Sequence, residues 1–431
     1  MPVLQLRCVL SCIRSVAAVE DPTRREICGR QRANTVGADE RNKVFRRVES
    51  LAKRIRKRRA RPLSYDPKHA LNAICPYFTM FPLEYPLRVL SRHRRAAPVV
   101  MDPFCGRGTT LYAARVLGLA ARGIDSSPIA IAIAQAKLCT VQRSEALDLA
   151  RNLIEQDETG PIPTNEYFRT GFHHTTLRQL CAVRWGLLKR HQKTHAAVLL
   201  RAAMLGCLHG PRAQSEANQS YFSNQMPRTF ASKPDYSVKY WKRHRLRSRQ
   251  VDVVAVLKRK LDRIETAAAS TGGPRRARLG DARLSESLPY SARDFSVVVT
   301  SPPYFGMRTY VEDQWLRNWF LGGPDHVEYG ETEQVSHAGA QTFAESLGEV
   351  WRNMARTRAA TLDLYIRFGV IPSSRVDARQ LMEESLEASG LEWKCVYTRA
   401  ARTASHGKRQ ATQMAAESAA TIEYDFHVIP A

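Results

Sequence analysis

Residues 96–138 constrain the fold more than any other part of the chain, because short apolar runs alternate there with helical patterns. The expected elements are, in order, a strand, a glycine-bearing loop, a helix, a second strand and a second helix, at 96–101, 102–108, 109–119, 121–125 and 126–138. Ser126 or Ser127 suits the cap of the second helix, and Pro128 suits its first turn. This order predicts a parallel α/β unit.

The α/β pattern returns near the end of the chain. Strands are expected at 295–300, 361–371, 391–401 and 420–429, the last two as an antiparallel pair, and helices at 344–358 and 377–390. The segment between lacks strand alternation and predicts helices at 146–156, 177–191 and 195–210. We therefore expect a basic arm at 1–62, an α/β domain in two parts at 63–140 and 279–431, and a helical insert at 141–278.

The charge balance indicates a polyanionic partner. Lysine and arginine total 66 against 41 acidic residues, which gives a net charge of +25. Such an excess is typical of proteins that bind nucleic acid, although solubility alone is the alternative. Residues 41–62 are the most basic run, and we expect either a solvated arm or a phosphate-contacting tail.

Other classes find little support in the sequence. No apolar run reaches the roughly 18 residues of a membrane span. The nine cysteines form no CxxC pair, so we expect reduced thiols in a cytoplasmic protein and no metal site.

The loop DPFCGRG has the features of a ligand site. Gly106 and Gly108 allow a tight turn and a close backbone approach, and the helix that opens near Thr109 directs N–H groups at an anion. Asp102, at the end of the strand, could hold a cation at the same place. A ligand that carries both a carboxylate and an ammonium group would fit, as the methionyl end of S-adenosylmethionine does.

Two further aspartates follow expected strands or turns. Asp125 lies 17 residues after Gly108, close to the spacing at which an acidic residue binds ribose hydroxyls, and a helix cap is the alternative. Asp281 could accept from an adenine amino group or simply stabilise a turn.

The strand at 295–300 runs into Ser301-Pro302-Pro303-Tyr304. The two prolines remove backbone donors and fix a rigid corner, so the Ser301 hydroxyl and the Pro302 carbonyl form an acceptor cluster. Tyr304 adds a flat aromatic face. An exocyclic base amine needs acceptors for its hydrogens, and a base removed from its helix needs a stacking partner. A proline-rich strand exit with a packed tyrosine is the structural alternative.

At these two motifs the chain resembles the DNA methyltransferases that methylate amino groups. DPFCGRGTT is similar to their FxGxG cofactor motif and TSPPY to their catalytic tetrapeptide, in the serine form typical of cytosine-N4 enzymes. The resemblance implies a Rossmann-like seven-stranded sheet with a reversed last strand, and S-adenosylmethionine as cofactor. The implied catalytic residues are Ser301, Pro302, Pro303 and Tyr304, and the implied cofactor contacts are Phe78, Asp102, Phe104, Gly106, Gly108, Thr109, Asp125 and Asp281.

The insert is then the expected nucleic-acid-binding region. Basic and aromatic residues interleave there, as suits phosphate contact and base stacking, at Arg228, Lys239, Trp241, Lys242, Arg243 and Arg245. An exposed basic helix is the alternative. We expect methylation of cytosine N4 in double-stranded DNA with the base flipped out, alongside a cognate restriction nuclease. The alternatives are adenine N6, an RNA base, and a nucleic-acid-binding protein with an inactive core.

Overall fold

The structure is a computed structural model. It describes residues 67–76, 82–140, 142–190, 193–210, 219–223, 233–264, 273–288, 295–306, 314–328, 339–356, 358–370, 374–401 and 423–431. The expected basic arm at 1–62, Phe78 and Arg228 lie outside the described residues.

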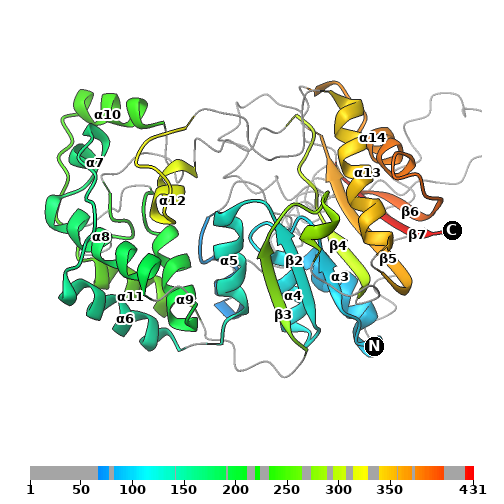
Figure 1. Cartoon of the computed structure of the whole chain (residues 1–431), viewed down its shortest axis with the longest axis horizontal. Helices are drawn as coiled ribbons and strands as arrows, with labels where there is room; N and C mark the ends of the chain where they lie inside the picture. The colour runs from blue at the N-terminus through cyan, green and yellow to red at the C-terminus, as the bar shows by residue number, and fades with distance from the viewer. Residues whose placement is uncertain are drawn as a thin grey trace, which may run out of the picture. The chain divides into compact units, whose positions relative to one another are not determined.

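The described residues form one seven-stranded sheet in the order β3-β2-β1-β4-β5-β7-β6 (Figure 1). The strands are β1 (Val100–Asp102), β2 (Ala121–Asp125), β3 (Arg275–Leu279), β4 (Phe295–Thr300), β5 (Arg358–Gly369), β6 (Trp393–Ala401) and β7 (Glu423–Pro430). Pairing is parallel from β3 to β5, whereas β7 runs antiparallel to both β5 and β6. The expected Rossmann-like α/β fold with a reversed last strand is therefore confirmed, as is the closing antiparallel pair.

Helices cover both faces of the sheet (Figure 1). They are α3 (Glu84–His93), α4 (Thr109–Val116) and α5 (Pro128–Leu138) on one face, and α13 (Ala340–Arg356) and α14 (Ala378–Glu387) on the other. Alternation along β4 explains this arrangement, because Val297 and Val299 pack in the core with α3–α5 while Val298 packs with α13 and α14. The second helix begins as expected, since Ser127 Oγ accepts from Ala130 N at 3.3 Å and Pro128 follows.

The insert is helical. Its helices are α6 (Arg143–Gln156), α7 (Glu166–Gly171), α8 (His174–Lys189), α9 (His195–Leu205), α10 (Pro234–Arg243) and α11 (Val253–Asp262). Short 3-10 turns lie at Pro67–Ala73, Arg94–Ala96 and Ser285–Ser287. α9 packs on both α6 and α5, so the apolar core of the insert is continuous with one face of the sheet.

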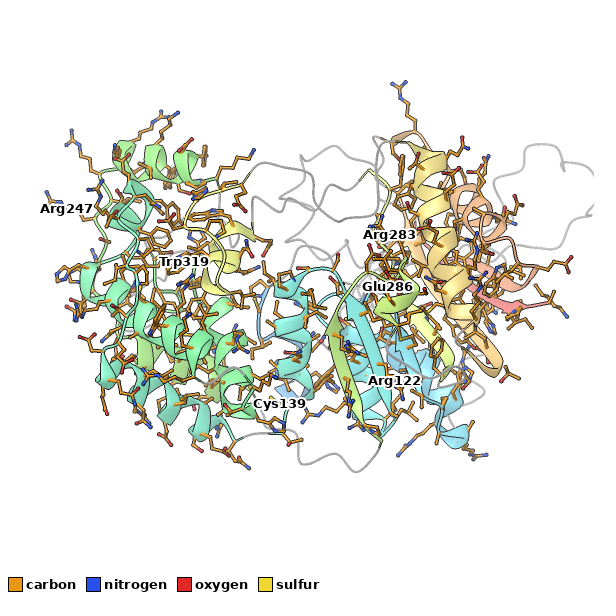
Figure 2. All side chains as sticks on the ribbon, in the orientation of Figure 1. Arg122, Cys139, Arg247, Arg283, Glu286 and Trp319 are labelled. Carbon is orange, nitrogen blue, oxygen red and sulfur yellow. The ribbon has the colours of Figure 1, made fainter. Side chains whose placement is uncertain are left out.

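A helix that follows the Ser301-Pro302-Pro303-Tyr304 motif in sequence belongs to the core of the insert. α12 (Trp315–Phe320) places Trp315 4.7 Å from Tyr167 and Trp319 4.6 Å from Phe168, measured between ring centroids. Trp319 lies among the side chains of the helical region in Figure 2. The chain therefore returns to the insert after it leaves the sheet at β4.

Strand β3 begins inside the range expected for the insert. Residues Arg275–Leu279 pair with β2 in parallel register at the edge of the sheet. Ala277 is the buried residue of this strand, and the arginines around it are at least partly exposed. An edge strand with so little apolar surface shows no alternating pattern, and for this reason the sequence did not predict it.

Among the described residues, no helix combines the length and the apolar character that crossing a bilayer requires.

Candidate active site

The predicted cofactor and catalytic residues meet at one edge of the sheet. Asp102 ends β1, Asp125 ends β2, Asp281 follows β3, and Ser301 follows β4. Because these strands are parallel, their carboxyl ends lie at the same edge, where ligands bind in open α/β sheets.

Asp102 is fully buried between the two motifs. Its Oδ1 accepts from Thr300 Oγ1 at 2.7 Å and from Phe104 N at 3.2 Å. Its Oδ2 has no hydrogen-bond partner among the described residues. Burial raises the pKa of Asp102 to about 7, against the opposing effect of its hydrogen bonds. A buried carboxylate oxygen without a donor is what a bound cation would satisfy.

The two glycines of the loop have different surroundings. Both have positive φ, +49° at Gly106 and +77° at Gly108. A Cβ at Gly106 would meet nothing closer than Phe104 O at 4.0 Å, whereas a Cβ at Gly108 would lie 2.8 Å from Ala134 Cβ on α5. Gly106 therefore borders open space, and Gly108 permits close packing of the loop on α5.

The other loop residues frame this turn. The Phe104 ring meets Trp351 of α13 edge-on at 6.3 Å between centroids, and Thr109 is buried as the first residue of α4. Cys105 is buried, and burial raises the pKa of its thiol well above the usual value. A thiol that stays protonated agrees with a packing role for this cysteine.

Asp125 connects β2 to the glycine loop. Its Oδ2 accepts from Gly106 N at 2.8 Å and its Oδ1 accepts from Ser127 N at 2.9 Å. A carboxylate has about four lone-pair sites, so each oxygen can take a further donor. Ser127 rather than Asp125 caps the helix that follows, and the Asp125 carboxylate keeps capacity for a pair of ribose hydroxyls.

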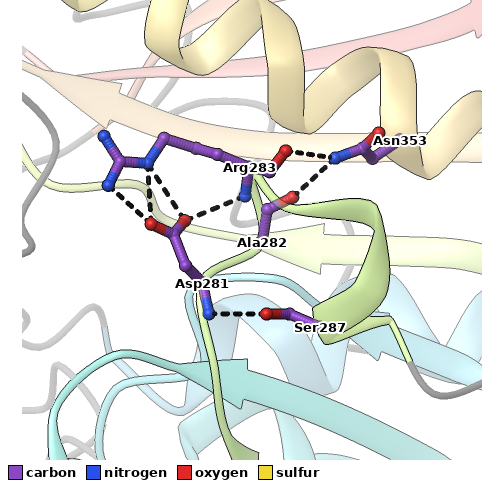
Figure 3. A network of polar contacts seen from close by, with 5 residues as sticks. All are labelled: Asp281, Ala282, Arg283, Ser287 and Asn353. Carbon is purple, nitrogen blue, oxygen red and sulfur yellow. Dashed lines mark hydrogen bonds and ion pairs between the residues drawn. The ribbon is translucent and has the colours of Figure 1, made fainter.

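Asp281 belongs to a network of polar contacts shown in Figure 3. Arg283 donates to both carboxylate oxygens of Asp281, with Nη2 2.5 Å from Oδ2, and Asp281 N donates to Ser287 Oγ at 3.2 Å. Asn353 of α13 holds the same turn, because its Nδ2 donates to the carbonyls of Ala282 and Arg283. Both carboxylate oxygens of Asp281 thus accept from Arg283, and a ligand amine would share this carboxylate with the guanidinium.

The Ser301-Pro302-Pro303-Tyr304 corner is partly accessible. Pro302 is buried, while Ser301, Pro303 and Tyr304 are half-buried. Thr110 Oγ1 donates to Val299 O at 3.1 Å, so the first turn of α4 is bonded to the strand that carries this corner.

Tyr304 has a partner that sequence reasoning missed. Its hydroxyl donates to Glu423 Oε1 at 2.8 Å, and its ring meets Phe368 edge-on at 6.0 Å. Glu423 stands 119 residues after Tyr304 and matches no motif, so no local signal in the sequence connects the two.

The expected nucleic-acid contacts on the insert divide into two groups. Lys239, Lys242, Arg243 and Arg245 are exposed, with Lys242 paired to Glu166, whereas Trp241 is 0% exposed. The Trp241 indole packs against Tyr167, with 5.2 Å between ring centroids, and against Gly171. No face of this indole is open to a base, which corrects the expected stacking role of Trp241.

A second basic surface lies on α11. A hollow beside this helix has three cations and no acidic residue among the described residues that line it, namely Gly206, Ser220, Tyr221, Val256, Arg259, Lys260 and Arg263. Arg247 projects from the outer side of the helical region (Figure 2).

No group of histidine, cysteine and acidic side chains in the described part of the chain is placed to hold a metal ion.

Comparison with known proteins finds distant likenesses. No protein-family model and no curated protein matches the sequence. The rRNA methyltransferase aviRa of Streptomyces viridochromogenes is 14% identical, with 84% of this chain and 92% of that chain covered and a TM-score of 0.31. PH1948 of Pyrococcus horikoshii, assigned as an RNA methyltransferase, is 9% identical, with 85% and 98% covered and a TM-score of 0.28. At these identities and TM-scores the likeness carries no argument about fold or function.

Proposed function

We propose that the chain transfers a methyl group from S-adenosylmethionine to an exocyclic amine of a nucleic-acid base, with cytosine N4 of DNA as the first candidate target. One observation carries the proposal. The glycine loop and the Ser301-Pro302-Pro303-Tyr304 corner leave neighbouring central strands, and the bond from Thr300 to Asp102 joins them. A methyl donor and a methyl acceptor must meet at such a junction.

The residues present fit the cofactor. Asp102 Oδ2 is a buried acceptor without a donor, and Gly106 borders open space that a side chain would fill. We assign the ammonium group to Asp102, the ribose hydroxyls to Asp125 and the adenine amine to Asp281. When bound, S-adenosylmethionine supplies a methyl group activated by its sulfonium.

We assign the activation of the target amine to the Ser301-Pro302-Pro303-Tyr304 corner. The amine of a base is a poor nucleophile, because its lone pair is conjugated with the ring. Acceptors at Ser301 Oγ and the Pro302 carbonyl would draw on its two hydrogens and free the lone pair. The Tyr304 ring would stack on a base that has left its helix. Positioning then provides most of the rate, and solvent takes the released proton.

The serine at position 301 favours cytosine over adenine, because the resemblance associates aspartate or asparagine there with adenine N6. The polymer is inferred from the positive charge, and the exposed cations of α10 and the cations that line the hollow beside α11 are the proposed phosphate contacts. A cognate restriction nuclease remains part of this proposal as a functional partner.

Mass spectrometry of nucleosides tests the proposal. DNA and RNA from cells that express the protein are digested to nucleosides, and mass spectrometry identifies the methylated species. We expect N4-methylcytosine in DNA, at a lower level when Tyr304 is changed to alanine. N6-methyladenine in DNA would show that the target base is adenine. A methylated amine found in RNA and not in DNA would show that the substrate is RNA. The absence of all three, together with no calorimetric binding of S-adenosylmethionine, would favour an inactive core.

A further inference from the structure

The hydroxyl of Tyr304 is already engaged at the proposed acceptor corner. It donates to Glu423 Oε1 at 2.8 Å, and burial is the largest cause of the raised pKa of both Tyr304 and Glu423. A phenol whose proton is directed to a carboxylate is held in one ring orientation, because charge-assisted hydrogen bonds are short and strong.

The reversed last strand brings Glu423 to this place. β7 runs antiparallel to β5, so its first residue lies at the edge where β4 and β5 end. Glu423 pairs with Gly369, and the adjacent Val370 forms a bridge with Phe305, the residue after Tyr304. A last strand in the parallel direction would place its other end here.

Among the described residues, no other side chain is hydrogen-bonded to the carboxylate of Glu423. The nearby cation is Arg367, and Asp425 binds it through both carboxylate oxygens at 2.7 and 2.9 Å. The second oxygen of Glu423 has no hydrogen-bond partner among these residues. The contact with Tyr304 is therefore the one bond that the structure gives to this carboxylate.

We propose that Glu423 is a positioning residue that fixes the Tyr304 ring for stacking on the target base. The carboxylate acts through the phenol and does not touch the base. The inference rests on the proposed function, since it gives Glu423 a part in base methylation. It also limits Tyr304 to the use of its ring face, because the hydroxyl is already bonded.

The experiment measures methyl transfer by Glu423→Ala, Glu423→Gln, Tyr304→Phe and the double variant Glu423→Ala/Tyr304→Phe. Glu392→Ala is the matched control, because Glu392 is exposed and precedes β6, at the end of the β6–β7 pair opposite Glu423. The steady-state constants for nucleic acid and for S-adenosylmethionine are determined for each variant. Thermal unfolding shows which variants are folded.

We expect Glu423→Ala and Tyr304→Phe to lower kcat/KM for nucleic acid by about tenfold to a hundredfold each, as the loss of a hydrogen bond to a charged group predicts. The double variant should be no worse than either single variant, since both remove one interaction. Glu423→Gln should recover most of the activity, because its amide oxygen can accept from the phenol. The KM for S-adenosylmethionine should not change.

Other outcomes separate the possible failures. If Glu423→Gln is as weak as Glu423→Ala while Tyr304→Phe is fully active, then Glu423 acts on its own charge and the positioning role is wrong. Full activity of a folded Glu423→Ala would also overturn it. If the wild-type protein itself transfers no methyl group, the proposed function fails instead.

Discussion

Thr300 Oγ1 donates to Asp102 Oδ1 at 2.7 Å, across 198 residues of sequence. Thr300 is the last residue of β4 and Asp102 the last residue of β1, so this bond connects the proposed catalytic corner to the proposed cofactor loop. It also fixes which oxygen of Asp102 stays available to a ligand. The position of the carboxylate therefore depends on the strand that carries the acceptor residues.

Replacement of Thr300 by valine should weaken S-adenosylmethionine binding and lower the free energy of unfolding by about 1–3 kcal/mol, because it removes the shorter of the two hydrogen bonds to a buried carboxylate oxygen and leaves the longer one from Phe104 N. Thr300→Ser keeps the hydroxyl and is the control. Calorimetry and urea denaturation measure the two effects. Equal cofactor affinity in the valine and serine variants would show that the bond does not hold Asp102 for binding.

Cofactor affinity should depend on pH through Asp102. Its pKa is raised to about 7 by burial, so the carboxyl loses its charge as pH falls below about 7. If an ammonium group binds there, the dissociation constant should increase by up to about tenfold for each pH unit below 7. Asp102→Asn should bind weakly at every pH and show a flatter profile. A wild-type profile in that variant would assign the titration to another group.

The same shift has a defined sign for stability without cofactor. The pKa of Asp102 in the folded chain lies above its unfolded value, so this carboxyl stabilises the fold at low pH and loses that contribution as pH rises through about 7. Asp125 shifts in the same direction, so only the difference between wild type and Asp102→Asn isolates the effect.

The two loop glycines should respond differently to alanine. Gly106→Ala places a methyl group in open space, so it should impair cofactor binding at a stability cost of about 1–2 kcal/mol for the left-handed backbone. Gly108→Ala also drives a methyl group into Ala134 and should lower the melting temperature much further. Thermal unfolding and calorimetry on both variants make the comparison. Unaltered cofactor affinity in Gly106→Ala would remove the loop from the site.

Loss of the Tyr304 ring should affect the base and not the cofactor. Base–aromatic stacking contributes about 1–3 kcal/mol for each base, and Tyr304→Ala also loses the bond to Glu423, so it should lower kcat/KM for nucleic acid by at least as much as Tyr304→Phe. Pro302→Ala should have a smaller effect through reduced rigidity. Fluorescence of 2-aminopurine at the target position reports whether the base still leaves the helix. Wild-type activity in Tyr304→Ala would exclude stacking.

The basic surface of α10 should bind through phosphates. Changing Lys239, Arg243 and Arg245 to alanine should weaken DNA binding for all sequences and reduce the slope of log affinity against log salt by about 0.9 for each phosphate that the variant no longer neutralises. Arg259→Ala/Lys260→Ala/Arg263→Ala tests the hollow on α11 in the same way. The control is Arg379→Ala/Lys394→Ala, which removes exposed cations from α14 and β6. Should none of these change the slope, the insert does not bind phosphates.

Local patterns predicted the first part of the sheet well. The order of strands and helices between 96 and 138 is as expected, although the first strand begins at Val100 and not at Ala96. This order is set by neighbouring apolar residues, by the Ser127 cap and by the turn at Gly106 and Gly108. Asp102, Asp125 and Ser301 could be placed at one edge for the same reason, since parallel strands align their carboxyl ends.

The rest depends on contacts between distant segments. Trp241 reads as a basic-patch aromatic in sequence, but α10 turns this side chain into the insert and leaves Lys239 and Arg243 outside. Arg283 looks like one more cation of a basic chain, yet it pairs with Asp281. Glu423 becomes relevant only through strand direction, which the residues around it do not specify.

The pairing of β1 with β4 also affects how the chain folds during translation. β1 can pair with β2 as soon as residue 125 has emerged, but its other edge stays unpaired until residues 295–300 are made. At about 5–20 residues per second, that interval lasts on the order of ten to forty seconds. Val100 and Met101, both 0% exposed in the folded chain, belong to this unpaired edge. During translation the centre of the sheet is therefore an open apolar edge, a target for chaperones or for aggregation, and it closes only after the whole insert has been made.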